Sequence, residues 1–266
     1  RMVQRSQSGD RVSTWKDLTA ELDLWAEAGD VATFWWRDDD AVRPTPPLDR
    51  LLNLRRKSGV PVAIAVVPAN AQPALAEILA GDDIDILQHG YAHRNHKDET
   101  GKRAELGDDR GLWDIARELA DGRGRMFDIF GEDGWTETMV PPWNRIDEPV
   151  TALLPGLGFH GLSTFRAREA VQPVPGLTAV NTHIDIVDWD GGRGYAGDQT
   201  TLSAAIAHLS AKRRGLADRG EATGLLTHHL AHDDTCWTFI DTFIDVTTGH
   251  TAANWVSARA LFPVPQ

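Results

Sequence analysis

Two histidines four residues apart, His89 and His93, are the first candidates for chemistry in this sequence. They follow a short apolar run, residues 84–87, that is typical of a buried strand. If the chain turns helical after that strand, both imidazoles lie on one face, one turn apart, and could bind Zn, Fe, Ni or Co. A solvated, histidine-rich loop is the alternative, because short motifs also match by chance.

Three consecutive aspartates, residues 38–40, could supply the third ligand of such a site. They come after the apolar run 31–36, and an acidic triplet so close to an all-apolar strand is unusual. A metal held by two histidines and one aspartate would lower the pKa of water to about 7, and a neighbouring aspartate could take the proton as general base. A solvated turn or a helix cap is the alternative for the triplet.

Apolar runs typical of strands alternate with stretches of helical spacing, mostly over short connections. This alternation predicts an α/β protein with a parallel sheet, in one domain over residues 1–266. The strands are expected within residues 31–36, 60–67, 85–88, 138–140, 159–164, 177–187 and 224–229.

The segments around these strands carry further expectations. Residues 1–12 are polar and are expected to be flexible. Residues 97–111 are expected to form a surface loop or lid, and residues 112–120 and 126–130 two helices. The C-terminal segment, residues 233–266, is expected to be helical and packed on the barrel.

The aspartates, the histidines and a Pro-Pro-Trp cluster at residues 141–143 all fall where a predicted strand ends. In a parallel barrel these carboxyl ends share one face, where active sites are built. The sequence therefore predicts that the three groups form one site.

Five short motifs occur in order between residues 33 and 229. They are Asp39-Asp40 followed by Ala41, His89-Gly90-Tyr91-Ala92-His93, Val140-Pro141-Pro142-Trp143, Asp185-Ile186-Val187-Asp188-Trp189 and Leu225-Leu226-Thr227-His228. Their order resembles that of the polysaccharide deacetylases, the NodB-homology carbohydrate esterases. The resemblance implies a single-domain, distorted (β/α) barrel of about seven parallel strands.

The resemblance also implies a metal-dependent carbohydrate deacetylase. In that case Asp39 is the general base, and Asp40, His89 and His93 bind a divalent metal. Zinc is the expected metal, with Co, Ni, Fe or Mn as alternatives.

The resemblance further implies a general acid that protonates the leaving amine. His228 is expected in this role, oriented by Asp185 or Asp188, although His229 follows directly and either histidine could serve. The backbone N–H of Trp143 would help to hold the oxyanion, a role that a positioned amide can fill.

The chain departs from the family's pattern at two positions. Val140 stands where the family has arginine, and Arg37 or Arg145 could supply that charge beside the base. Ala41 stands where the family has glycine. The pair Asp38-Asp39 could replace Asp39-Asp40, but the small Ala41 favours the later register.

Several aromatic and polar residues are placed by their position in the pattern. Those expected to line the substrate groove follow strands at the catalytic face: Trp143, Trp189, Arg145 and Asp188. The tryptophans expected in the core are Trp35, Trp36, Trp113 and Trp255. His96 either orients a ligand or faces solvent, and ordinary structural or surface roles are expected for His160, His183 and His208.

The composition excludes some classes of function. The net charge of −12 disfavours nucleic acid as a partner, because phosphate binding depends on Lys and Arg. The single cysteine, Cys236, allows no internal disulfide, and no apolar run is long enough for a membrane helix. No signal-peptide core is visible, so a cytoplasmic location is expected, with a periplasmic or secreted one open if a signal was removed. The oligomeric state is left open.

The favoured hypothesis is a metal-dependent hydrolase that removes an N-acyl group, in first place acetyl, from an amino sugar or polysaccharide. Hydrolysis of another non-peptide C–N amide is a variant on the same fold. The rival hypothesis is a non-catalytic carbohydrate-binding protein with a deacetylase fold, because a fold does not fix a function.

Overall fold

The structure is a computed structural model that describes residues 12–264 except residues 82, 99–100 and 108. The predicted flexible segment 1–12 therefore lies outside the described residues except for Val12. Within the described residues, no helix is both long and apolar enough to cross a membrane.

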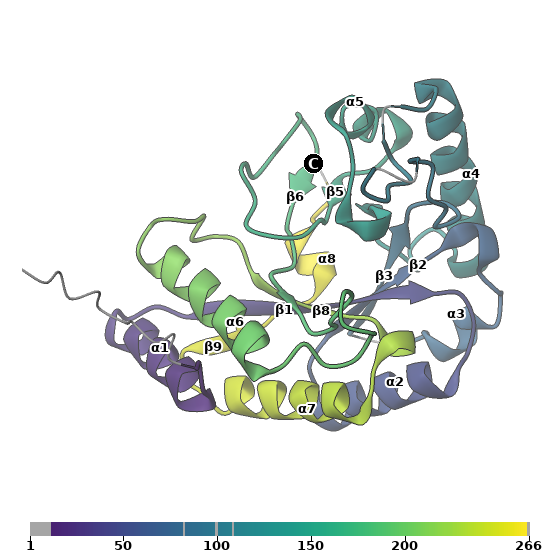
Figure 1. Ribbon diagram of the computed structural model, residues 1–266. Helices are drawn as coiled ribbons and strands as arrows, with labels where there is room; N and C mark the ends of the chain where they lie inside the picture. The colour runs from purple at the N-terminus through teal and green to yellow at the C-terminus, as the bar shows by residue number, and fades with distance from the viewer. Residues whose placement is uncertain (1–11, 82, 99–100, 108, 265–266) are drawn as a thin grey trace, which may run out of the picture.

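Nine strands of the described chain form one sheet in which all pairings are parallel (Figure 1). The order is β6-β5-β4-β3-β2-β1-β8-β7, and β9 also pairs with β1. The bounds are β1 (Ala32–Ala41), β2 (Val62–Val66), β3 (Ile84–His89), β4 (Thr138–Val140), β5 (Gly161–Leu162), β6 (Thr178–Ala179), β7 (Ile184–Asp185), β8 (Thr223–Thr227) and β9 (Ala253–Trp255). The curled sheet with flanking helices confirms the predicted distorted (β/α) barrel.

The helices lie around this sheet, with α1, α6, α7 and α2 in a row along one side (Figure 1). The α-helices are α1 (Trp15–Glu27), α2 (Pro46–Ser58), α3 (Leu75–Ile78), α4 (Leu112–Phe130), α5 (Glu148–Thr151), α6 (Asp198–Arg213), α7 (Asp234–Thr248) and α8 (Ala258–Leu261). Short 3₁₀ turns are η1 (Pro68–Asn70), η2 (Pro142–Asn144), η3 (Pro155–Leu157) and η4 (His229–Ala231).

The prediction of two helices at 112–120 and 126–130 is wrong, because α4 runs through both without a break. Two glycines, Gly122 and Gly124, lie in the interval between the two predicted helices. Gly122 is buried where α4 crosses the sheet, and a β-carbon there would come within 2.5 Å of Nε2 of Gln88. The glycine therefore allows close packing and does not end the helix.

The C-terminal segment is not wholly helical, which corrects the expectation for residues 233–266. After α7 the chain forms β9, whose Ala253 and Trp255 are in register with Ala32 and Phe34 of β1. The rings of Trp255 and Phe34 stack with their centroids 5.4 Å apart. The aromatic pair and the parallel ladder together attach the end of the chain to the first strand.

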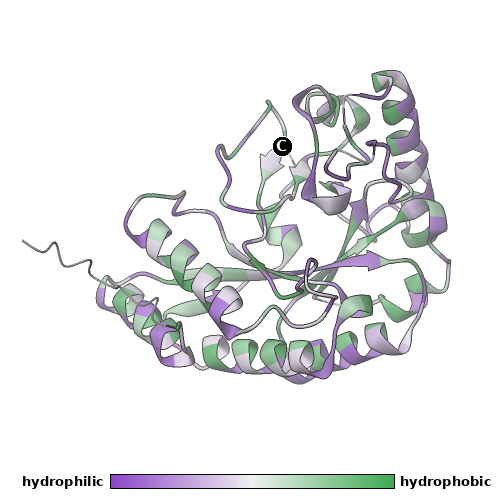
Figure 2. Cartoon of the chain, viewed as in Figure 1, coloured by the Kyte–Doolittle hydropathy of each residue, from purple (hydrophilic) through white to green (hydrophobic). Residues whose placement is uncertain are grey.

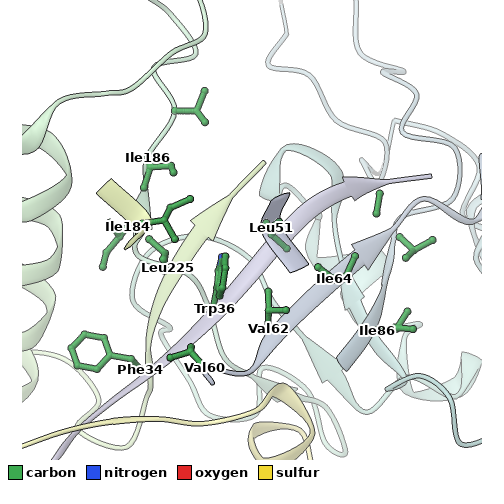
Figure 3. Packing of buried hydrophobic residues seen from close by; sticks show 14 of the residues in the cluster. Phe34, Trp36, Leu51, Val60, Val62, Ile64, Ile86, Ile184, Ile186 and Leu225 are labelled. Carbon is green, nitrogen blue, oxygen red and sulfur yellow. The ribbon is translucent and has the colours of Figure 1, made fainter. Parts of the chain in front are cut away.

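The core has two parts on opposite faces of β1. Phe34 and Trp36 belong to the larger cluster, between the sheet and the outer helices (Figure 3). Trp35 points the other way and joins Phe262, after α8, in a smaller cluster inside the barrel. This alternation explains why the whole apolar run is buried, as predicted for a strand that is covered on both faces.

Hydrophilic and hydrophobic residues alternate along the helices, while the strands are mostly hydrophobic except for the end of β1 (Figure 2). Trp113 is an exception to its predicted place in the core, because 80% of its surface is exposed near the start of α4. The prediction failed because helical spacing does not show which side of a helix faces the sheet at its first turn. The core prediction holds for Trp35 and Trp36, whereas Trp255 is half-buried.

Candidate active site and metal centre

A cavity of about 710 Å³ opens at the carboxyl ends of the strands. Residues that follow or end β1, β3, β4, β7 and β8 line it, among them Asp39, His89, Trp143, Asp185 and His228. Segments far apart in the sequence thus meet in one place, as the shared strand ends predict.

Asp40, His89 and His93 converge at the floor of this cavity. Oδ1 of Asp40 lies 3.2 Å from Nε2 of His89 and 3.3 Å from Nε2 of His93. Nδ1 of His89 lies 2.9 Å from the carbonyl oxygen of Val140, so the ring donates its proton there and presents Nε2 to the cavity. Oδ1 of Asp40 is buried and has no hydrogen-bond partner in the described chain. This donor set fits a divalent cation such as zinc.

The charges of these groups depend on one another. Burial alone would raise the pKa of Asp40, but the nearby imidazole of His89 outweighs it and holds this pKa well below its ordinary value. Burial alone would lower the pKa of His89, but the carboxylates of Asp39 and Asp40 outweigh it and raise this pKa. Burial, with the charge of His89, lowers the pKa of His93. The carboxylate of Asp40 thus favours a positive charge beside it, either a proton on His89 or a metal cation.

The two histidines are not on a helix, which corrects the expected helical turn. His89 ends β3, Gly90 has a φ of +54° and His93 a φ of +53°. A tight loop brings their ring centroids to 5.1 Å. A β-carbon at Gly90 would overlap the carboxylate of Glu105 and the ring of Pro142, so only glycine fits this turn.

Glu105 organises this loop. It is fully buried, and its carboxylate accepts hydrogen bonds from the backbone N–H groups of Tyr91, Ala92 and Arg94. The segment 97–111, predicted to be a surface loop or lid, is therefore partly buried. Its charged composition gives no sign of this, since a buried and an exposed glutamate look alike in a sequence.

A β-bulge explains how Asp39 and Asp40 both reach the cavity. Successive residues of a strand point to opposite faces. The pairing of β1 with β2 shifts register between Asp38 and Ala41, and Asp40 has a φ of +76°. The bulge turns Asp40 to the side of Asp39, a common use of bulges beside functional sites.

Asp39 is held by Arg37 through two parallel hydrogen bonds. Nε and Nη2 of Arg37 lie 2.9 and 3.0 Å from the two carboxylate oxygens, and both side chains are buried. Arg37 also donates to Oγ of Ser163 and to Oδ1 of Asn144. Arg145, the other candidate for this charge, instead donates to the carbonyl oxygen of Arg103.

Asp38 lies on the other face of β1, away from the cavity lining. Its Oδ1 is 2.5 Å from Nδ1 of His229, and its Oδ2 accepts from the hydroxyl of Thr227. Both Asp38 and His229 are buried. Burial alone would raise the pKa of Asp38, but the charge of His229 outweighs it and lowers this pKa. The structure thus separates His229 from the cavity and leaves His228 in it.

His228 faces Asp39 across the cavity, with Nε2 3.9 Å from Oδ2 of the aspartate. The ring of Trp189 meets the ring of His228 edge-on, with centroids 4.7 Å apart. Asp185 accepts a hydrogen bond from Nε1 of Trp189, and burial raises the pKa of this aspartate. Asp185 lines the cavity, whereas Asp188 is exposed and accepts hydrogen bonds within its own turn.

Trp143 follows β4 and has an unusual backbone. Its φ is +56° and that of Asn144 is +55°. The ring of Trp143 lies 4.3 Å from the ring of His93, centroid to centroid. His96 is half-buried and does not line the cavity.

Non-glycine residues with positive φ gather at this face of the molecule. In the described chain they are Asp40, Asp83, His93, Trp143, Asn144, Arg166 and Arg193. All except Asp83 and Arg166 line the cavity, and Arg166 lines the neighbouring one. Such conformations cost stability and tend to persist at functional sites.

Comparisons with known proteins agree with this geometry at the level of the fold. No protein-family model matches the sequence, and no curated protein matches it. Among solved structures, a protein from Mycobacterium smegmatis described as a candidate polysaccharide deacetylase is 17% identical, with a TM-score of 0.61, over 90% of this chain and 94% of that one. The chain has the polysaccharide deacetylase fold.

Two further structures with this deacetylase fold are similar. A family 4 carbohydrate esterase from Streptomyces lividans, in complex with acetate, is 15% identical over 84% of this chain and 90% of that one, with a TM-score of 0.53. A family 4 acetyl xylan esterase from Clostridium thermocellum, in complex with a cobalt ion, is 14% identical over 86% and 90%, with a TM-score of 0.51.

A second group of potential ligands lies at the opposite end of the strands of this deacetylase fold. Nε2 of His183 and Nε2 of His208 lie 3.4 and 3.7 Å from Oε2 of the buried Glu221. The backbone N–H of Gly224 donates to Nδ1 of His183, so the neutral ring carries its proton on Nε2. That nitrogen has no lone pair for a metal, and Glu221 instead accepts hydrogen bonds from the backbone N–H groups of Arg168 and Asn181. Both histidines are buried, which suits the expected structural role.

Proposed function

We propose that the protein is a metal-dependent hydrolase that removes an N-acyl group, in first place acetyl, from an amino sugar, with the whole chain acting as one catalytic domain. The observation that carries this proposal is the convergence of Asp40, His89 and His93 beside an aspartate that Arg37 holds in place. The similar structures support it, because those of known activity are esterases and deacetylases of carbohydrates.

Asp40, His89 and His93 would hold the cation, with zinc expected and cobalt, nickel, iron or manganese able to replace it. The cobalt ion in the Clostridium thermocellum relative supports this assignment. When bound, such a cation supplies Lewis acidity that polarises an acyl carbonyl and lowers the pKa of water.

Asp39 is proposed as the general base. Arg37 uses two hydrogen bonds to fix the plane of this carboxylate, which leaves lone pairs of the oxygens free to take a proton from the attacking water. The backbone N–H of Trp143 is proposed to donate to the carbonyl oxygen as it gains negative charge.

His228 is proposed as the general acid. Its Nε2 lies 3.9 Å from Oδ2 of Asp39, so the acid and the base stand next to each other and can both act on an amide that lies against them. The proton that Asp39 takes from water is balanced by the proton that His228 gives to the leaving amine nitrogen. Asp185 holds Trp189 against the imidazole and is proposed to keep the acid in place.

Metal content and amine release from N-acetylated chito-oligosaccharides test the proposal together. We expect one divalent cation per chain, loss of this cation in His89→Ala, and loss of turnover with the cation retained in Asp39→Asn. Asp121→Asn, which removes an exposed carboxylate from α4, is the control and should change neither property. Binding of sugar that survives both substitutions, with no turnover of any amide, would favour the non-catalytic alternative.

A further inference from the structure

The rim of the cavity is basic in a chain whose net charge is −12. The exposed residues that line the cavity include three arginines, Arg103, Arg145 and Arg193, and one carboxylate, Asp190. The arginines come from three separate segments: the loop before α4, the turn after β4 and the loop after β7. The fold therefore places three cationic side chains at the outer part of an opening whose inner part carries Asp39, Asp40 and Asp185.

No carboxylate of the described chain forms an ion pair with these three guanidinium groups. Exposed arginines elsewhere do form such pairs, for example Arg50 with Asp234. Arg145 donates through Nη1 to the backbone carbonyl oxygen of Arg103, 2.7 Å away, which ties the turn after β4 to the loop before α4. Cationic side chains at an opening without a counter-charge attract an anion.

The backbone adds an independent observation. Arg193 has a φ of +64°, and Arg166, which lines an adjoining cavity, has a φ of +81°. The two cavities share Asn144 and Arg145 in their linings and are therefore adjacent. Most residues avoid this conformation, and its cost is tolerated mainly where function requires a given side chain.

Two exposed apolar side chains complete the rim. Trp189 is 44% exposed and Leu230 is 53% exposed, and both line the same cavity. An aromatic face beside charged donors suits a sugar ring that carries an ionised substituent.

We propose that the substrate is an anionic N-acyl sugar, whose carboxylate or phosphate group binds Arg103, Arg145 and Arg193 at the rim while its amide lies at the floor. The position of the amide in this inference rests on the proposed function. The recognition of the anion is argued only from the three arginines at the rim. The adjoining cavity also presents Glu148 and Glu169, so the anion is assigned to the three arginines of the first cavity.

Binding measured by calorimetry tests the proposal independently of turnover. The ligands are N-acetylglucosamine, N-acetylmuramic acid, which adds a carboxylate, and N-acetylglucosamine 6-phosphate. We expect one or both anionic ligands to bind at least about tenfold more tightly than the neutral sugar in low salt, with the advantage lost in high salt. The stronger of the two identifies the anionic group.

Arginine variants locate the contact. Arg103→Gln, Arg145→Gln and Arg193→Gln should each weaken the anionic ligand about fivefold and leave the neutral sugar unchanged, with a larger effect in the triple variant. Arg214→Gln removes the same charge from the exposed C-cap of α6, outside both cavities, and should change neither ligand.

The outcomes separate the two proposals. Equal binding of neutral and anionic ligands, or no effect of the three substitutions, overturns the anionic substrate even if the enzyme deacetylates neutral sugars. Selective binding of anionic sugars without deacetylation of any of them leaves the inference standing and overturns the hydrolase.

Discussion

Arg37 lies two residues before Asp39 on the same strand, so both side chains point to the same side of β1. The pattern of the deacetylases that the sequence resembles places an arginine where this chain has Val140, at the end of β4. The sequence left Arg37 and Arg145 as equal candidates, because spacing along a strand does not show which guanidinium reaches the carboxylate. The two hydrogen bonds between Arg37 and Asp39 show that the arginine beside the proposed base comes from β1.

Substitution of Arg37 should affect both activity and folding. Arg37→Met leaves a buried carboxylate without its partner, which should lower the free energy of unfolding by about 3–5 kcal/mol. Arg37→Lys keeps the charge but loses the paired hydrogen bonds, so it should remain folded with kcat reduced by about tenfold or more. Urea unfolding and steady-state kinetics measure the two effects, and a Lys variant with unchanged kcat would contradict the positioning role.

At the scale of elements, the loop from His89 to His93 shows what the sequence could and could not reveal. The spacing singled out both histidines as candidate ligands, and the structure brings them together, but the same spacing suggested a helix where the chain makes a tight turn. The turn depends on Glu105, which lies far along the chain and supplies the acceptor that a helix would find in its own backbone. Such a contact leaves no local pattern.

Glu105→Gln should weaken metal binding. Glutamine has one oxygen where three backbone donors require two, so the loop loses at least one hydrogen bond and the imidazoles lose their alignment. We expect metal affinity to fall by about 10–100-fold, as for other supports of metal ligands. Competition with a chelating dye measures it. Affinity equal to that of the parent would show that the loop holds its shape without Glu105.

Two glycines of α4 form a matched pair. Gly122→Ala would press a methyl group against Gln88, which bonds to the carbonyl oxygens of Gly90 and Leu119, and should destabilise the protein by about 1–3 kcal/mol. Gly124→Ala meets no atom within 4 Å and should stabilise it by about 0.5–1 kcal/mol through helix propensity. Thermal unfolding of both variants tests the difference, and changes of the same sign would refute it.

For the whole molecule, the alternation of apolar runs and helical stretches in the sequence was enough to predict a parallel sheet. The parallel sheet in turn predicted that the carboxyl ends of the strands meet at one site. The bulge in β1 could not be foreseen, because its sequence, Asp38 to Ala41, also suits a regular turn. The strand β9 was hidden for a similar reason, since its three residues are too few to show a period.

Buried histidines should make the whole fold sensitive to acid. Burial lowers the pKa of His183 to about 4 and that of His232 to about 4, and it also lowers the pKa of His208. In the unfolded chain these imidazoles take up protons near pH 6.5, whereas in the folded protein they stay neutral to a lower pH. Their contribution to the free energy of unfolding is therefore present above pH 6.5 and is lost as the pH falls towards 4. His89 and His229 have raised pKa values and act in the opposite sense.

A variant isolates one of these rings. Between pH 7.5 and pH 5, the free energy of unfolding should fall by about 2 kcal/mol less in His183→Asn than in the parent protein. Urea titrations at both pH values measure this difference. The same dependence on pH in both proteins would show that His183 is not the group that takes up the proton on unfolding.

The pairing of β9 with β1 also bears on how the protein is made. The central strand of the sheet finds β2 early, but its other neighbours, β8 and β9, are translated near the end of the described chain. Until they leave the ribosome, β1 lacks its partner β8 along one edge and its partner β9 beside β2 on the other. Nascent chains should therefore depend on chaperones until β8 and β9 have been synthesised, because this topology places strand partners far apart along the polypeptide.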